Sequence, residues 1–170
     1  MSENKEVENY EHNLKLYNES IRKDLDITLI SIIPTQKNLM KTILWLNSSI
    51  IGLCLAALSN KIGIIYISMP FVFSFIGIIT ILYSLKDGRV KMLGTPSIES
   101  IENIKNDKYE KTNALITMNE SFEKALINNT KLIEKRAKKI AFATNMSILS
   151  VTIIFIIAVL YVNINLMKGG

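Results

Sequence analysis

Three long runs without a charged residue divide the chain into apolar and polar stretches. The first two, Thr42–Ser59 and Ile62–Leu85, are separated only by Asn60-Lys61, and the third is Ile140–Met167. A helix of about 20 apolar residues crosses the hydrocarbon core of a bilayer, where only helices and closed barrels keep their backbone hydrogen bonds. The pattern therefore predicts a transmembrane hairpin followed by a third transmembrane helix. Two buried helices of a soluble core are the alternative interpretation.

The stretch before the hairpin has the period of an amphipathic helix. Its apolar positions recur at steps of three and four, at Tyr10, Leu14, Tyr17, Ile21, Leu25 and Thr28. Such a stripe is typical either of a helix that packs on a neighbour or of a coiled-coil seam between subunits. Because proline disfavours helical geometry in the residue before it, Pro34 predicts a kink and a fresh helix start at Thr35.

The stretch after the hairpin predicts a long helix that continues into the third span. Its apolar face contains Leu115, Met118, Phe122, Ala125, Leu126, Leu132 and Ile133. Asn129 interrupts this face at a position that should be buried, where a polar residue can specify the register against a partner.

The predicted fold class is an all-α integral membrane protein. It has an N-terminal cytoplasmic amphipathic helix (1–38), a two-span transmembrane hairpin (39–85), a cytoplasmic helical region (86–139) with a long helix continuous with the third transmembrane helix (140–167), and a short tail (168–170).

Positive charge is concentrated in two of these segments. Of the 20 Lys and Arg residues, six lie in residues 1–41, one at the hairpin tip, twelve in residues 86–139 and one in the tail. Cytoplasmic loops carry the excess of Lys and Arg, so the N-terminus and residues 86–139 are predicted in the cytoplasm and the C-terminus outside. A basic juxtamembrane patch precedes the third span: Lys131, Lys135, Arg136, Lys138 and Lys139. These residues either set the topology and bind anionic lipid, or form a binding site for a ligand that carries a phosphate.

The first span carries small residues at intervals of four: Ser48, Gly52, Ala56 and Asn60. Small residues let helices approach closely in lipid, and the amide of the neighbouring Asn47 can form hydrogen bonds between helices. We therefore predict that Asn47, Ser48, Gly52 and Ala56 form a helix-packing or pore face, as a pore lining or a subunit interface. Packing of this row against the second span of the same chain is the alternative.

The residues of an active site are not evident. His12 is the only histidine and lies on a polar helix, and no set of Cys, His, Asp and Glu residues has metal-ligand spacing. No Gly-rich phosphate loop follows a strand. The sequence thus predicts a protein that is not an enzyme and needs no cofactor. Nucleic-acid binding is not expected either, because the topology accounts for the basic charge.

The order of segments resembles a family of small bacterial membrane effectors, the PycTM-type proteins of Pycsar anti-phage systems. The resemblance is carried by the hairpin at 42–85, the connector Met92-Leu93-Gly94, and residues 127–161, where INNTKLIEKRAKKIAFATN enters the last span. Related two-span effectors of cyclic-nucleotide defence systems are a second match. The resemblance implies a protein of the bacterial inner membrane that senses a cyclic pyrimidine mononucleotide and then damages the host membrane. It transfers no ligand-binding residue, because no motif matches position by position.

The sequence therefore supports two alternative hypotheses for the function. The first is a homo-oligomeric effector that impairs inner-membrane integrity when a cyclic nucleotide triggers it. The second is a non-enzymatic membrane scaffold whose cytoplasmic helices hold a partner protein. A constitutive phage-type holin is a third option, which the large cytoplasmic portion disfavours.

Overall fold

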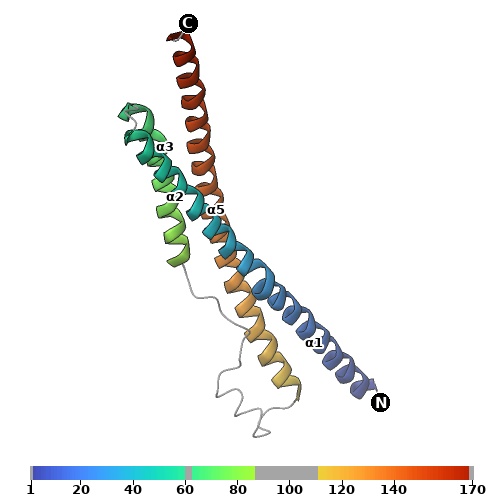
Figure 1. Cartoon of the computed structure of the whole chain (residues 1–170). Coiled ribbons are helices and arrows are strands. Elements are labelled where there is room, and N and C mark those ends of the chain that lie inside the picture. The colour runs from blue at the N-terminus through green and yellow to red at the C-terminus, as the bar shows by residue number, and fades with distance from the viewer. Residues whose placement is uncertain (1, 60–62, 87–110, 169–170) are drawn as a thin grey trace. The chain divides into compact units, whose positions relative to one another are not determined.

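The computed structural model describes residues 2–59, 63–86 and 111–168 (Figure 1). Within these ranges the chain is almost wholly helical and contains no strand. In chain order the elements are α1 (Ser2–Ile27), the π-helix η1 (Thr28–Ile32), α2 (Ile33–Ser59), α3 (Ile64–Lys86) and α5 (Lys111–Lys168). Three helical segments are long and apolar enough to cross a membrane. At this level the predicted all-α fold with three candidate spans is confirmed, and the chain has the character of a multi-pass membrane protein.

The contacts divide the chain into two compact units, each built from two separate stretches. The first unit contains Met1–Thr35 and Gly88–Glu134, and the second unit contains Gln36–Asp87 and Lys135–Gly170. The hairpin tip and much of the predicted cytoplasmic region, at 60–62 and 87–110, lie outside the described residues. The predicted cytoplasmic and transmembrane segments are defined by where they lie relative to a membrane, which a division by contacts does not test. Their bounds stay predictions.

In the first unit, α1 and the first part of α5 lie side by side. The apolar part of their contact is formed by Ile21, Leu25, Phe122 and Ala125. The predicted packing of the N-terminal helix on a neighbour is thus confirmed within the chain. Tyr10 and Tyr17 of the predicted stripe are nevertheless exposed. The prediction that these two residues belong to the packed face of α1 is therefore wrong.

Polar side chains complete this contact at positions that the predicted stripe left out. Lys111 forms an ion pair with Glu11 at 2.6 Å, and its hydrogen bond holds the pKa of Glu11 below the usual value. Asn18 donates to Oδ1 of Asn119 at 2.7 Å, and Nδ2 of Asn119 donates to the carbonyl of Leu14 at 3.2 Å. Residue numbers rise together on the two helices, so they run parallel, and Asn119 sets their register.

Replacing Asn119 by alanine is expected to loosen α1 from α5. The substitution removes two hydrogen bonds from a side chain that is 5% exposed, at a cost of about 1–2 kcal/mol. Measured by hydrogen–deuterium exchange, the α1 amides around Ile21 should exchange about 5- to 30-fold faster. Asn113→Ala, at an exposed position of α5, is the matched control. Equal protection in both variants would show that Asn119 does not hold the pairing.

A π-helical turn, Thr28–Ile32, lies where a kink and a fresh helix start at Thr35 and Gln36 were expected. Ile33 has helical backbone angles (φ −65°, ψ −45°), and its N–H donates to the carbonyl of Thr28, five residues back. Pro34 therefore lies in the first turn of α2, and the predicted fresh start at Thr35 is wrong. A proline ring clashes with the carbonyl four residues earlier in an α-helix, and the wider π turn relaxes that spacing. The turn also absorbs one extra residue, so Thr28 and Ile33 are both buried although five apart.

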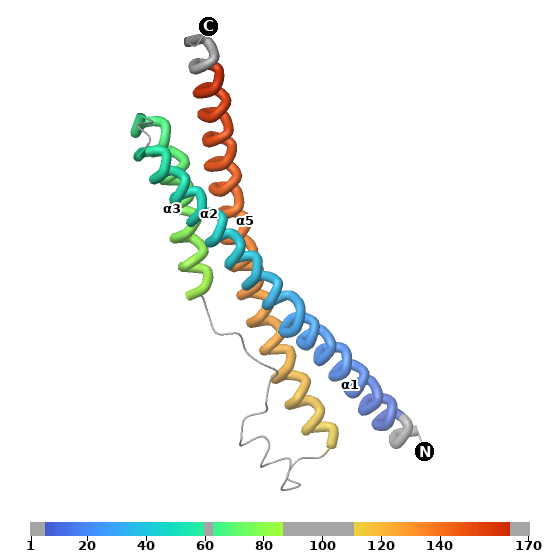
Figure 2. Tube along the Cα trace, in the orientation of Figure 1, coloured from blue at the N-terminus to red at the C-terminus, as the bar shows by residue number. Residues whose placement is uncertain are grey.

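The second unit contains α2, α3 and the rest of α5. Figure 2 shows α2 and α3 lying side by side, and their side chains share two apolar clusters. One apolar cluster contains Met40, Ile43, Ile81, Ile140 and Ala143, and the other contains Ile50, Cys54 and Ile67. Along these clusters the numbers of α3 fall while those of α2 rise, so the hairpin is antiparallel. The numbers of α5 rise with those of α2, so these two helices run parallel.

Candidate functional site

Four buried polar side chains lie between the two apolar clusters of the second unit. This polar layer, as we name it, consists of Asn47 of α2, Ser74 of α3, and Ser147 and Ser150 of α5, each no more than 2% exposed. Burying a polar group among apolar side chains costs free energy unless the group is hydrogen-bonded. The partners of these four side chains therefore decide what the layer does.

Asn47 joins α2 to α5. Its Nδ2 donates to the carbonyl of Ile43 at 3.0 Å, and its Oδ1 accepts a hydrogen bond from the hydroxyl of Ser147 at 3.1 Å. The same hydroxyl is 2.9 Å from the carbonyl of Ala143 in its own helix. A serine hydroxyl has a single proton, so these two acceptors compete for it. The bond between the helices can thus be exchanged for a bond within α5 without leaving Ser147 unsatisfied.

Ser150 joins α5 to α3 in the same layer. Ser74 donates to Oγ of Ser150 at 3.1 Å, and Ser150 reaches the carbonyl of Pro70 at 3.1 Å. The carbonyl of Met146, at 3.0 Å in its own helix, is its competing acceptor. A hydrogen bond between protein groups typically contributes about 0.5–1.5 kcal/mol net. The polar layer therefore contributes modestly to the packing of the three helices. If the helices separate, Ser147 and Ser150 each keep an acceptor in α5.

Gly77 permits the close approach of α3 to Asn47. A Cβ atom at this position would lie 2.9 Å from Nδ2 of Asn47 and 3.3 Å from its Cγ. Real Cβ atoms essentially never come that near, so any larger residue must displace the amide. Because the amide is held by Ile43 and Ser147, displacing it disturbs the hydrogen bonds of the polar layer.

The predicted helix-packing or pore face is divided in the structure. Asn47 is fully buried, whereas Ser48, Gly52 and Ala56 are exposed on the opposite side of α2. Nothing lies within 4 Å of a Cβ built on Gly52. The interpretation that this row packs against the second span of the same chain is therefore wrong for these three residues. Consecutive helix positions differ by about 100° in direction, so Asn47 and Ser48 face different surroundings. The subunit-interface interpretation of the row stays a prediction.

The predicted basic juxtamembrane patch is also divided. Lys131 belongs to the first unit, and the other four residues belong to the second. Lys131, Lys135 and Lys138 are exposed, Lys139 is half-buried, and Arg136 is only 4% exposed. The guanidinium of Arg136 is thus not part of an open basic surface. A role of the exposed lysines with lipid or ligand phosphate stays a prediction.

The sequence analysis did not assign a role to Ser147, Ser150 or Gly77. A usable signal was present in the third span, where Ala143, Ser147 and Ser150 follow one another at steps of four and three. Residues at this spacing share one helix face. A face of small and polar residues in an otherwise apolar span marks a packing surface.

The site thus consists of hydrogen bonds between helices, with alternative acceptors for Ser147 and Ser150 within α5. In the part of the chain that the structure describes, no group of three or more His, Cys, Asp or Glu residues is placed to hold a metal ion. Comparison of the chain with models of protein families, with curated proteins and with solved structures gave no match.

Proposed function

We propose that this chain is a membrane-embedded effector that impairs inner-membrane integrity when it is triggered. The insertion of the second unit is supported by its outer surface, which carries large apolar side chains such as Trp45 (73% exposed), Ile65 (79%) and Phe155 (69%). Exposed large apolar side chains in this number are unfavourable in water and indicate a membrane or an interface. The distribution of Lys and Arg favours a cytoplasmic N-terminus and an external C-terminus.

The observation that carries the effector proposal is the polar layer. Its four side chains satisfy one another across three helices, at a depth where the surrounding side chains are apolar. When the helices separate, Ser147 and Ser150 turn to acceptors in their own helix, while Asn47 and Ser74 offer polar atoms to water. The closed arrangement is thus weakly held, and an open arrangement has polar groups with which to line a water path.

Opening is controlled from the cytoplasmic side in this proposal. A ligand shifts an equilibrium only by binding one state more tightly than the other. The resemblance to PycTM-type effectors supports a cyclic pyrimidine mononucleotide as that ligand. Assembly of several chains through the exposed row of Ser48, Gly52 and Ala56 brings several such units together, since small residues allow close helix contacts in lipid.

Vesicle leakage tests the proposal directly. The purified chain, reconstituted into vesicles that contain carboxyfluorescein, is expected to release dye when cyclic UMP or cyclic CMP is added. Vesicles without protein and vesicles given cyclic AMP are the controls. The rate of dye release should rise with nucleotide concentration, because a ligand shifts the equilibrium only by its differential affinity for the open state. Intact vesicles under every nucleotide, with insertion verified by protease protection, would contradict the effector proposal.

A scaffold remains the second candidate because of the first unit. Its helix α1 leaves Val7, Tyr10, Leu16 and Tyr17 exposed. Large apolar side chains on a helix surface fit a partner helix. Co-purification of one partner protein in stoichiometric amount, together with vesicles that do not leak, would favour this function over the effector.

A further inference from the structure

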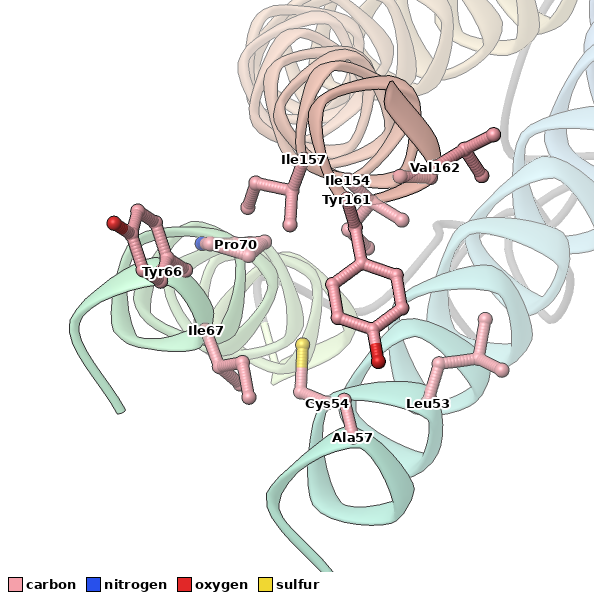
Figure 3. Close-up of a pocket in the computed structure, with 11 residues that line it drawn as sticks. Leu53, Cys54, Ala57, Tyr66, Ile67, Pro70, Ile154, Ile157, Tyr161 and Val162 are labelled. Carbon is pink, nitrogen blue, oxygen red and sulfur yellow. The ribbon is translucent and has the colours of Figure 1, made fainter. Parts of the chain in front are cut away.

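The three helices of the second unit leave an apolar cavity beyond the polar layer. It opens to the surface, because lining residues such as Leu53, Tyr66 and Tyr161 are themselves exposed. Its volume is about 260 Å³. The residues that line it are Leu53, Cys54 and Ala57 of α2, Tyr66, Ile67 and Pro70 of α3, and Ile154, Ile157, Ala158, Tyr161 and Val162 of α5. In Figure 3 the ring of Tyr161 extends from α5 toward α2, beside Cys54. No charged side chain is among the described residues of the lining.

The cavity lies where the apolar packing face of α5 continues but is only partly covered by α2 and α3. Buried positions of α5 follow one another at steps of three and four from Ile140 to Ser150. Ile154, Ile157 and Tyr161 continue the same spacing along the cavity. Their neighbours across the gap include Cys54 and Ala57, which are too small to fill it. The helix face is therefore built for apolar contact, and part of that contact is missing.

We propose that this cavity holds one acyl chain of a membrane phospholipid. An apolar lining offers water few of the two to four polar partners that an ordered water needs, and enclosed apolar cavities of about 150 Å³ bind small apolar molecules such as benzene. The volume here exceeds that size but cannot admit a helix, which is about 10–12 Å across. A flexible hydrocarbon chain fits both limits. The uncharged lining suits an acyl chain whose headgroup stays at the membrane surface, and phospholipids are the main source of such chains in a bilayer.

The inference rests on membrane insertion and is independent of the effector activity. Photolabelling tests it in lipid nanodiscs that contain the full chain and a small fraction of phosphatidylglycerol with a diazirine at the end of one acyl chain. After illumination, labelled residues are located by mass spectrometry. Adducts are expected on Cys54 and Ile67, which are only 3% and 5% exposed and line the cavity. None is expected on Met40 and Ile81, which are fully buried outside it.

Two variants fill the cavity from different helices, Ala57→Phe from α2 and Ala158→Phe from α5. Each should reduce the adducts on Cys54 and Ile67 by about tenfold, which corresponds to a loss of 1.4 kcal/mol of binding. Leu55→Phe, on the exposed side of α2, is the matched control and should leave them unchanged.

Four results would overturn the inference. The first is labelling confined to exposed side chains such as Ile65 and Phe155. The second is labelling of Cys54 in Ala57→Phe and Ala158→Phe that equals its labelling in the parent chain. The third is labelling of the cavity by a diazirine fatty acid but not by the phospholipid, which would refute the phospholipid as the source. The fourth, no labelling in any of the three helices, would also refute membrane insertion, on which the effector proposal depends.

Discussion

Replacing Gly77 by alanine is expected to destabilise the second unit by about 1–3 kcal/mol, the usual cost of overpacking. The added methyl group would lie 2.9 Å from Nδ2 of Asn47. That amide is held by Ile43 and Ser147, so moving it breaks hydrogen bonds as well as contacts. The change is measurable as a lower midpoint of thermal unfolding in detergent micelles.

A double-mutant cycle identifies the cause. Asn47→Ala removes the side chain that the new methyl group would meet, so adding Gly77→Ala to this variant should cost much less than in the parent chain. Coupling between residues in contact is about 0.5–3 kcal/mol. Ser68→Ala, at an exposed position of α3 outside the polar layer, is the control. Additive effects of the two substitutions would show that Gly77 and Asn47 do not meet.

Replacing Gly52 by leucine is expected to weaken assembly without disturbing the single chain. A Cβ atom at Gly52 meets no other group within 4 Å, so the larger side chain has room within the chain. At an interface between copies the same side chain would hold two helices apart, since close approach depends on small residues. We expect about tenfold weaker association. Light scattering in detergent measures the oligomer, and dye release from vesicles measures the activity.

Ser68→Leu is the matched control for this experiment. Ser68 is a small, exposed residue of α3, and its hydroxyl bonds to the carbonyl of Ile65 within its own helix. The control should leave both oligomer size and dye release unchanged. An unchanged oligomer in Gly52→Leu would refute the interface at this row. A smaller oligomer with full dye release would show that leakage does not require assembly through α2.

Some residues have a sequence pattern that fits two different structures. Tyr10 and Tyr17 have the right spacing for the seam of α1, yet Glu11 and Asn18 take the contacts with α5 instead. A polar residue that pairs across a seam is indistinguishable, in one sequence, from a polar residue that faces water. Pro34 likewise predicts a kink and a fresh helix start, whereas in the structure a π turn precedes it and the helix continues.

The sequence by itself determined the helical class, the three apolar segments and the return of α2 into α3. These features follow from long runs of apolar residues, because each helix satisfies its own backbone and needs no information from the rest of the chain. The tertiary structure alone decided which side of each apolar helix faces inward. A helix in lipid is apolar on its inner and outer faces, so hydrophobicity does not distinguish them, and the inner face is selected by close packing and hydrogen bonds. For this reason the sequence identified Ser48, Gly52 and Ala56 as a packing face but not their exposure within the chain. The contacts of Asn47 with Ser147 and Gly77 were likewise evident only from the three-dimensional structure.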